Sequence, residues 1–157
     1  YLGTYTCPRN SDIQSFLRQK AIQFELRNIA RTYLLMDELN GALLGYFTLT
    51  FKEISLDKSI SKSLRKELDG FSKNSEQVRA YLIAQLGKNF SIANNPLRLA
   101  SILEDHLYPV LAKAQKMVGG RVILLECENT QPLIRHYEST GFKLLQSPRL
   151  AQMFRGI

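Results

Sequence analysis

The chain has few of the residues that build redox and metal sites. Among its 157 residues there is no tryptophan, and there are two cysteines and two histidines. Cys7 lies in a loop-like TCP stretch and Cys127 in an apolar segment, so we expect no disulfide framework. Neither cysteine has another cysteine or a histidine at metal-ligand spacing. These features predict a metal-free protein in a reducing, cytoplasmic environment.

Long apolar runs are also missing. The longest ones, such as LLGYFTLTF, are too short to cross a bilayer, and no signal peptide is visible. The composition is 45% hydrophobic and 22% charged, which is ordinary for a globular protein. The length suits one domain spanning residues 1–157.

Three sequence motifs of common enzyme classes are not found. The chain has no G-x-x-x-x-G-K-[ST] loop, no G-x-G-x-x-G after a strand, and no G-x-S-x-G elbow. His106 lies close to the apolar stripe of a predicted helix, and His136 precedes a tyrosine. We interpret both histidines as packing or surface residues. The sequence therefore gives no support for a P-loop protein, a dinucleotide-binding protein or a serine hydrolase.

What the sequence does have is positive charge. Its 21 lysines and arginines outnumber 14 acidic residues, which gives a net charge of +7 and a pI near 9.5. This charge favours an anionic partner such as a phosphorylated cofactor, RNA, DNA or an acidic protein. A mildly basic domain that binds no nucleic acid is the alternative, since there is no RGG run, zinc finger or dense basic block.

Hydrophobic periodicity predicts a helix and a hairpin in the first third of the chain. Residues 10–29 carry apolar side chains at helical spacing. Residues 31–37 and 42–54 have the pattern of two strands, joined by a turn at Asn40-Gly41. The polar stretch 55–77 has only a weak helical stripe, so its structure is left open.

The rest of the chain has the pattern of a strand–helix–strand unit followed by short elements. Residues 78–88 are apolar nearly throughout and predict a central strand. Residues 97–118 predict a long helix, kinked or restarted at Pro109, and residues 121–127 predict another buried strand. The remaining predictions are a helix at 130–140 that ends at Gly141, and strands at 142–146 and 150–154. The fold class is therefore α+β, with a parallel or mixed sheet covered by helices.

Several segments together resemble the GCN5-related N-acetyltransferase (GNAT) family. They are YLIAQLGKNF with the long helix after it, GGRVILLECE and LIRHYESTGF, in which His136 to Phe142 match the pattern H/F-Y-E-x-x-G-F. With YTCPRNSDIQSFLRQKA and RTYLLMDELNGALLGYFTLT, the chain resembles the branch containing aminoacyl-tRNA-acetylating toxins of bacterial toxin–antitoxin pairs. The resemblance implies a central mixed, twisted sheet of about six to seven strands, with splayed central strands and flanking helices.

The resemblance also implies acetyl-CoA (coenzyme A) as cofactor and two segments that bind it. The backbone of Leu86, Gly87 and Lys88 would contact the acetyl carbonyl and the pantetheine arm. The loop and helix start that follow would hold the pyrophosphate, through the residues Asn94, Asn95, Leu97, Arg98 and Leu99. Thr130 stands where the family usually has an asparagine, and the family's glycine-rich loop is NNPLRL here. Either this loop takes a different path, or cofactor binding is weakened or lost.

For catalysis, the resemblance implies that Tyr137 protonates the departing thiolate; the alternative is a tyrosine packed under the sheet. Glu126 is a candidate general base, and the alternative is a surface residue at a strand end. The implied reaction transfers an acetyl group from acetyl-CoA to a primary amine in a direct ternary complex. The amine could belong to a small molecule, a protein or an aminoacyl-tRNA. A degenerate, non-catalytic module that binds CoA or RNA is a further alternative.

The expected partners are a tRNA, an antitoxin protein and a second copy of the chain, and no membrane is expected. Seven cations could contact tRNA phosphates or could simply be solvated helix faces. They are Arg18, Lys20, Arg27, Arg31, Lys62, Arg65 and Lys66.

Overall fold

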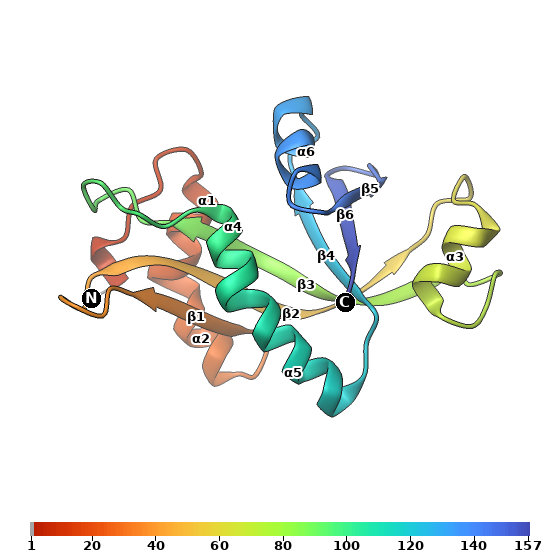
Figure 1. The fold of residues 1–157 in the computed structure, drawn as a ribbon, viewed down its shortest axis with the longest axis horizontal. Helices are drawn as coiled ribbons and strands as arrows, with labels where there is room; N and C mark the ends of the chain where they lie inside the picture. The colour runs from red at the N-terminus through yellow and green to blue at the C-terminus, as the bar shows by residue number, and fades with distance from the viewer. Residues whose placement is uncertain (1) are drawn as a thin grey trace. The chain divides into compact units, whose positions relative to one another are not determined.

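The computed structural model describes residues 2–157 and contains one mixed six-stranded sheet in the order β1-β2-β3-β4-β6-β5 (Figure 1). The strands are β1 (Arg31–Met36), β2 (Leu43–Ser55), β3 (Gln77–Lys88), β4 (Val122–Cys127), β5 (Lys143–Gln146) and β6 (Ala151–Gly156). β3 and β4 are parallel, whereas β1 with β2, β4 with β6 and β5 with β6 are antiparallel. The predicted α+β class with a mixed sheet is confirmed.

The helices follow in the predicted order. A short turn η1 (Leu2–Thr4) precedes a helical run made of α1 (Ser11–Ser15), the π-helical η2 (Phe16–Lys20) and α2 (Ala21–Leu26). α3 (Lys62–Asp69) lies between β2 and β3, and α6 (Gln131–Glu138) lies between β4 and β5. The long run comprises α4 (Leu99–Ser101), the π-helical η3 (Ile102–Leu107) and α5 (Tyr108–Val118).

Pro109 marks a restart within the long run. α5 begins at Tyr108, so Pro109 occupies its second position, directly after the π-helical turn. Proline has no amide hydrogen, and a wider turn before it accommodates the missing intrahelical bond. A new segment, α5, therefore begins one residue before Pro109, and the helical run stays continuous through the proline.

The chain divides into two compact units, with the divisions falling within β2, within β3 and at the start of α5. Unit 1 comprises residues 2–50 and 84–108, and unit 2 comprises residues 51–83 and 109–157. The prediction of one domain over residues 1–157 stays a prediction.

The core of unit 1 joins the N-terminal segment, the first helical run and β2. It contains Tyr5, Cys7, Phe16, Leu17, Ala21, Leu43 and Tyr46. The rings of Tyr5 and Tyr46 meet edge to face with centroids 5.2 Å apart, and the Tyr46 hydroxyl donates to the Ile13 carbonyl at 2.5 Å. The first run starts after Asn10, whose side chain accepts from two amides of the first turn, as an N-cap does.

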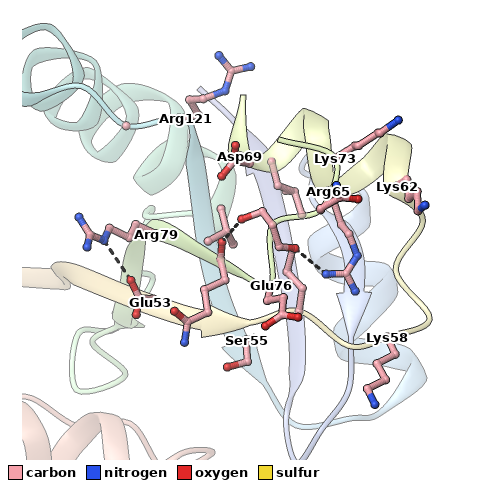
Figure 2. Close-up of a pocket in the computed structure, with 17 residues that line it drawn as sticks. Glu53, Ser55, Lys58, Lys62, Arg65, Asp69, Lys73, Glu76, Arg79 and Arg121 are labelled. Atoms are coloured by element: carbon pink, nitrogen blue, oxygen red, sulfur yellow. Dashed lines mark hydrogen bonds and ion pairs between the residues drawn. The ribbon is translucent and has the colours of Figure 1, made fainter. Parts of the chain in front are cut away.

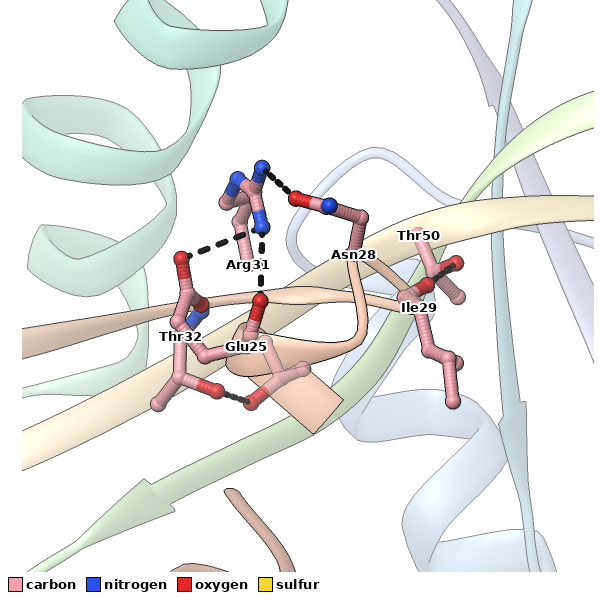
Figure 3. Close-up of polar contacts among 7 residues, drawn as sticks. Glu25, Asn28, Ile29, Arg31, Thr32 and Thr50 are labelled. Carbon is pink, nitrogen blue, oxygen red and sulfur yellow. Dashed lines mark hydrogen bonds and ion pairs between the residues drawn. The ribbon is translucent and has the colours of Figure 1, made fainter. Parts of the chain in front are cut away.

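A polar cluster at Arg31 holds the turn from α2 to β1 (Figure 3). Arg31 forms an ion pair with Glu25 at 3.2 Å and donates to the Asn28 side-chain oxygen at 2.7 Å. Asn28 has a φ of 56°, a left-handed conformation that ends the helix three residues before the predicted position 29. Thr50 closes the turn by donating to the Ile29 carbonyl at 2.7 Å. Arg31, one of the cations considered for tRNA, therefore has a structural role here.

The core of unit 2 lies between the sheet and α3. It contains Ile54, Leu56, Ile60, Leu68, Val78, Ala80, Val122, Leu124, Leu145 and Phe154. α3, yellow in Figure 1, lies within residues 55–77, whose structure the sequence left open. Ser61 caps its first turn by accepting from the Leu64 amide at 3.2 Å, and Gly70 ends it with a φ of 91°.

The parallel register between β3 and β4 is short. It runs from Tyr81↔Ile123 to Ile83↔Leu125, while β3 continues to Lys88. The end of β3 belongs to unit 1 and β4 to unit 2, so the predicted splay of the central strands stays a prediction. Over residues 2–157, no helix is both long and apolar enough to span a membrane.

Candidate functional site

The predicted site residues belong to both units. Those from Leu86 to Leu99 are in unit 1, whereas Glu126, Thr130 and Tyr137 are in unit 2.

In unit 1, the end of β3 has a glycine, Gly87, where the neighbouring residues leave no room for a side chain. A Cβ atom on Gly87 would lie 2.2 Å from the Tyr5 hydroxyl oxygen and 2.6 Å from the Ile13 Cγ2 atom. On β2, a Cβ atom on Gly45 would lie 2.7 Å from the Gly87 carbonyl oxygen. Any side chain at either glycine would therefore push neighbouring groups apart. The predicted contact segment Leu86–Lys88 depends on this close packing.

The Tyr5 hydroxyl beneath Gly87 is fully buried and, in the described part of the chain, has no hydrogen-bond partner. Burial, followed by the nearby Cys7 thiol, raises the pKa of Tyr5 far above the ordinary tyrosine value. The Cys7 thiol contributes to this raised pKa through its charge, although it forms no hydrogen bond with the Tyr5 hydroxyl. The phenol is therefore neutral and serves as a packing element under the strand.

Asn89 fastens the chain directly after β3. It is almost completely buried, and its side-chain oxygen accepts from the amides of Thr6 and Ser91, both at 3.0 Å. Its side-chain nitrogen donates to the Leu43 carbonyl at 2.7 Å. Asn89 thus joins the N-terminal segment to β2 and to the candidate cofactor loop. Sequence reasoning missed it, because an asparagine after a strand has no signal that names distant partners.

Asn95 shapes the candidate cofactor loop in the same way. Its side-chain nitrogen donates to the carbonyls of Leu44 at 2.8 Å and Asn89 at 2.9 Å. Its side-chain oxygen accepts from the Leu97 amide at 3.0 Å, and the Lys88 ammonium donates to the Asn95 carbonyl at 2.6 Å. The side chains of Asn95 and Lys88 are therefore used to build the loop, and they bond to its backbone at Asn89, Asn95 and Leu97.

The next residues explain how this loop manages without glycine. Asn94 is exposed and has a φ of 54°, a left-handed conformation that asparagine tolerates better than most residues. Leu97 is buried, and the exposed Arg98 is extended just before the helical run that begins at Leu99. The first amides of a helix have no carbonyl partners within it and suit an anion.

In unit 2, α6 ends in a Schellman motif that positions Tyr137. The Phe142 amide donates to the Tyr137 carbonyl at 3.2 Å, and the Gly141 amide donates to the Glu138 carbonyl at 3.0 Å. Gly141 has a φ of 89°, so the predicted left-handed cap is confirmed. A hydrophobic contact often accompanies this motif, and the Tyr137 and Phe142 rings meet edge to face with centroids 6.3 Å apart. The glycine and phenylalanine of the block thus fix the tyrosine ring.

The Tyr137 hydroxyl makes no hydrogen bond to other residues among 2–157. In contrast, the hydroxyls of Tyr46 and Tyr81 donate to the carbonyls of Ile13 and Gly119. Burial, followed by the Cys127 thiol, raises the pKa of Tyr137, so its hydroxyl keeps its proton at neutral pH. A protonated phenol that the fold does not use could serve as a general acid.

Thr130 precedes α6 in an extended conformation and makes no side-chain capping bond. It is exposed, so its predicted cofactor contact stays a prediction. His106 and His136 are both exposed, which agrees with a surface position for each.

Glu126 is held by a polar network that the sequence did not predict. The Lys52 ammonium donates to both carboxylate oxygens, at 2.8 and 2.7 Å, and Gln152 donates to one of them at 2.8 Å. Gln146 in turn donates to the Gln152 side-chain oxygen at 2.7 Å. One carboxylate oxygen therefore accepts two hydrogen bonds and the other accepts one, all from residues of unit 2. This arrangement favours a structural role for Glu126 over that of a general base.

Metal chemistry has no candidate centre in the part of the chain that the structure describes. No group of three or more histidine, cysteine or acidic side chains there could hold a metal ion. Cys7 and Cys127 are both free thiols.

The sequence of the chain matches no protein-family model and no curated protein. Its structure, however, is similar to solved structures over 99% of the chain. AtaT complexed with acetyl-methionyl-tRNAfMet is 20% identical, has a TM-score of 0.77 and is covered over 87% of its length. A tyrosine-to-phenylalanine mutant of KacT is 19% identical, also with a TM-score of 0.77 and 87% of its length covered. A mutant AtaT toxin bound to the C-terminus of the antitoxin AtaR and acetyl-CoA is 18% identical, with a TM-score of 0.71 and 84% covered. The chain therefore has the GNAT fold of AtaT and KacT.

Proposed function

We propose that the chain is an acetyl-CoA-dependent N-acetyltransferase that acetylates the α-amine of an aminoacyl-tRNA and acts as the toxin of a toxin–antitoxin pair. The observation that carries this proposal is the fold shared with AtaT at a TM-score of 0.77. AtaT has been seen with acetyl-methionyl-tRNAfMet, with acetyl-CoA and with the antitoxin AtaR. An antitoxin is accordingly the proposed protein partner, and a homodimer stays a prediction.

The residues of unit 1 fit the phosphate and pantetheine parts of acetyl-CoA. The left-handed turn at Asn94, the exposed Arg98 and the helix start at Leu99 together offer backbone amides and a cation. We assign the pyrophosphate to these residues and the pantetheine arm to the backbone of Leu86–Lys88. The glycine-free loop fits because asparagine supplies the backbone conformation that glycine would supply elsewhere.

In the proposed reaction, the acceptor nitrogen attacks the acetyl carbonyl carbon, a C–N bond forms and the C–S bond of the thioester breaks. A backbone amide stabilises the oxyanion. Tyr137 gives its hydroxyl proton to the departing sulfur, and the amine releases its surplus proton to water. Tyr137 recovers a proton from solvent.

An α-amine is the acceptor that needs the least help from a general base, and Glu126 is already bonded to Lys52 and Gln152. At pH 7.5, an α-amine with a pKa near ~8 is neutral in about a quarter of molecules. A lysine side chain with a pKa of ~10.4 is neutral in only about one molecule in a thousand. The α-amine of an aminoacyl-tRNA can therefore attack without a strong base.

The proposal is tested by offering the purified chain acetyl-CoA and three acceptors: an aminoacyl-tRNA, a lysine-containing peptide and a small primary amine. We expect micromolar acetyl-CoA binding by calorimetry and acetylation of the aminoacyl-tRNA alone. If the peptide or the small amine is acetylated instead, the proposed aminoacyl-tRNA substrate is wrong and that amine takes its place. Absence of acetyl-CoA binding would favour the non-catalytic module.

Glu126→Gln should leave the kcat of acetylation within about threefold of the wild-type value, because Glu126 is occupied by Lys52 and Gln152. A general base would contribute about 10²–10⁴-fold. The substitution should lower the free energy of unfolding by about 1–2 kcal/mol, because Lys52 loses its partner in a half-buried position. Urea unfolding and steady-state kinetics measure the two effects.

Glu53→Gln is the matched control for Glu126→Gln. Glu53 pairs with Arg79 at 3.1 Å in an exposed position, so its loss should change stability by less than about 1 kcal/mol. A fall in kcat of a hundredfold or more for Glu126→Gln, with Glu53→Gln unchanged, would restore Glu126 as the base.

A further inference from the structure

A large open cavity lies beside α3 in unit 2 (Figure 2). Its volume is about 1300 Å³, and it is formed by the end of β2, α3 with its flanking loops, the start of β3 and the residues just before β4. Cationic side chains dominate the charge of its lining: Lys58, Lys62, Arg65, Lys73, Arg79 and Arg121. Neither the proposed acetyl transfer nor the proposed cofactor contacts use this cavity.

Most of the acidic charge in the cavity is already balanced. Glu53 forms an ion pair with Arg79, and Asp69 accepts from the amides of Phe71 and Ser72, at 3.2 and 2.6 Å. The positive charge of Arg121 also stabilises the Asp69 carboxylate and contributes to its lowered pKa. Glu76 is the remaining acidic residue in the lining.

The lysines of the rim carry the excess positive charge. Lys58, Lys62 and Lys73 are exposed, and their side chains form no ion pair or hydrogen bond with any other residue among 2–157. The lining thus has three lysines without ion-pair partners and one remaining acidic side chain, Glu76. This excess is available to an anionic ligand.

Arg65 makes the rim rigid. Its guanidinium donates to the carbonyls of Asp57 at 2.5 Å, Ile60 at 3.0 Å and Ser75 at 2.6 Å. It therefore ties the loop before α3 to the loop after it, and Lys58 and Lys73 lie on these two loops. Arg65 was considered from the sequence as a phosphate contact, but the structure uses it to position the cations around it.

Exposed aromatic rings accompany these cations. Phe71 lies two residues after the end of α3 and is 91% exposed. Phe51 is 66% exposed, contacts the Tyr81 ring at 5.0 Å and lines an adjoining cavity of about 470 Å³ that shares Arg79 with the larger one. Unpaired RNA bases stack on such rings while lysines contact the phosphates. Protein interfaces, in contrast, are depleted in lysine.

We propose that the cavity beside α3, together with Phe71, binds the phosphate backbone and unpaired bases of an RNA. This inference rests on the proposed function, in which the RNA is an aminoacyl-tRNA with a single-stranded 3′ end. It assigns RNA binding to Lys58, Lys62 and Lys73 rather than to Arg18 or Arg31, which bond within unit 1 to the Tyr5 carbonyl and to Glu25.

The first test replaces the three rim lysines together, as Lys58→Gln, Lys62→Gln and Lys73→Gln. Binding of fluorescently labelled, non-acylated tRNA is followed by anisotropy between 50 and 200 mM salt. We expect affinity to fall at least tenfold and the slope of log Kd against log salt to decrease by about 2, at ~0.7 for each lost phosphate contact. The matched control removes three exposed lysines elsewhere in unit 2, as Lys113→Gln, Lys116→Gln and Lys143→Gln, and should change affinity less than threefold.

The second test concerns base stacking. Phe71→Ala should weaken binding of a single-stranded RNA oligonucleotide at least fivefold and leave binding of a duplex RNA unchanged, whereas Phe71→Tyr should bind like wild type. Phe71 is almost fully exposed, so circular dichroism should show an intact fold.

Each of three results with nucleic acids would overturn the inference: no tRNA binding by the wild-type chain, an equal loss in the control triple variant, or a duplex DNA that binds as tightly as RNA without dependence on Phe71. An acidic protein that binds the rim while tRNA does not would also overturn it. Because the probe carries no amino acid and acetyl-CoA is omitted, a failure of RNA binding is distinguishable from a failure of acetyl transfer.

Discussion

Replacing Tyr137 with phenylalanine should lower the kcat of acetyl transfer at least a hundredfold and leave the affinity for acetyl-CoA unchanged. Loss of a general acid removes about 10²–10⁴-fold in rate. Phenylalanine keeps the ring that packs on Phe142 and removes only a hydroxyl with no hydrogen bond inside the described residues. The free energy of unfolding should therefore change by less than about 0.5 kcal/mol.

The pH dependence gives this prediction a second readout. The active form of Tyr137 is protonated, and its pKa is raised, so activity is present below that pKa and is lost as pH rises through it. The kcat of the wild-type chain should not fall from loss of this proton up to about pH 10, the ordinary tyrosine pKa. Tyr137→Phe should lack any decline at higher pH.

Tyr33→Phe is the control for Tyr137→Phe. Tyr33 stacks on Phe47 in unit 1 with centroids 4.9 Å apart, and its hydroxyl has no assigned role in the reaction. It should keep full activity. If the chain is a toxin, its expression should arrest growth, and Tyr137→Phe should relieve that arrest while Tyr33→Phe does not. Arrest that persists with Tyr137→Phe, or a kcat within threefold of wild type, would remove Tyr137 from the mechanism.

Gly87→Ala should lower the free energy of unfolding by about 1–3 kcal/mol and weaken acetyl-CoA binding at least tenfold. The new Cβ atom would lie 2.2 Å from the Tyr5 hydroxyl and 2.6 Å from Ile13, so β3 would have to shift. The same shift would displace the backbone of Leu86–Lys88, to which the pantetheine arm is assigned. Urea unfolding and calorimetry with acetyl-CoA measure the two effects.

A double variant separates the steric cause from other effects of Gly87→Ala. Tyr5→Phe removes the nearest atom, which is the oxygen of a buried hydroxyl without a hydrogen-bond partner. Alone, this substitution should leave the free energy of unfolding unchanged or raise it by about 1 kcal/mol. Added to Gly87→Ala, it should restore about half of the lost stability, because the Ile13 contact remains. Gly156→Ala, with open space around the new Cβ, should change stability by less than about 0.5 kcal/mol. Equal losses for Gly87→Ala and Gly156→Ala would contradict the packing argument.

Local chemistry allowed much of the fold to be predicted from the sequence. The apolar segment 78–88 is found as β3, Gln77–Lys88, whose residues 80–88 are buried or half-buried on both faces and need no polar alternation. The hairpin is found as β1 and β2, with Gly41 at a φ of 68° in the connecting turn. α3 was left open although Ser61 and Gly70 are a helix cap and a helix stop, because its apolar stripe is weak.

The sequence by itself therefore determined the order of the elements, the Gly141 cap that holds Tyr137, and the likeness to the GNAT fold. Each depends on residues a few positions apart, whose spacing is visible in the chain. Only the tertiary structure showed that Glu126 is bound by Lys52, that Asn89 joins three segments, and that Gly87 lies against Tyr5. These contacts join residues distant in sequence, so hydrogen-bond geometry and excluded volume decide them, and neither leaves a periodic pattern in the chain.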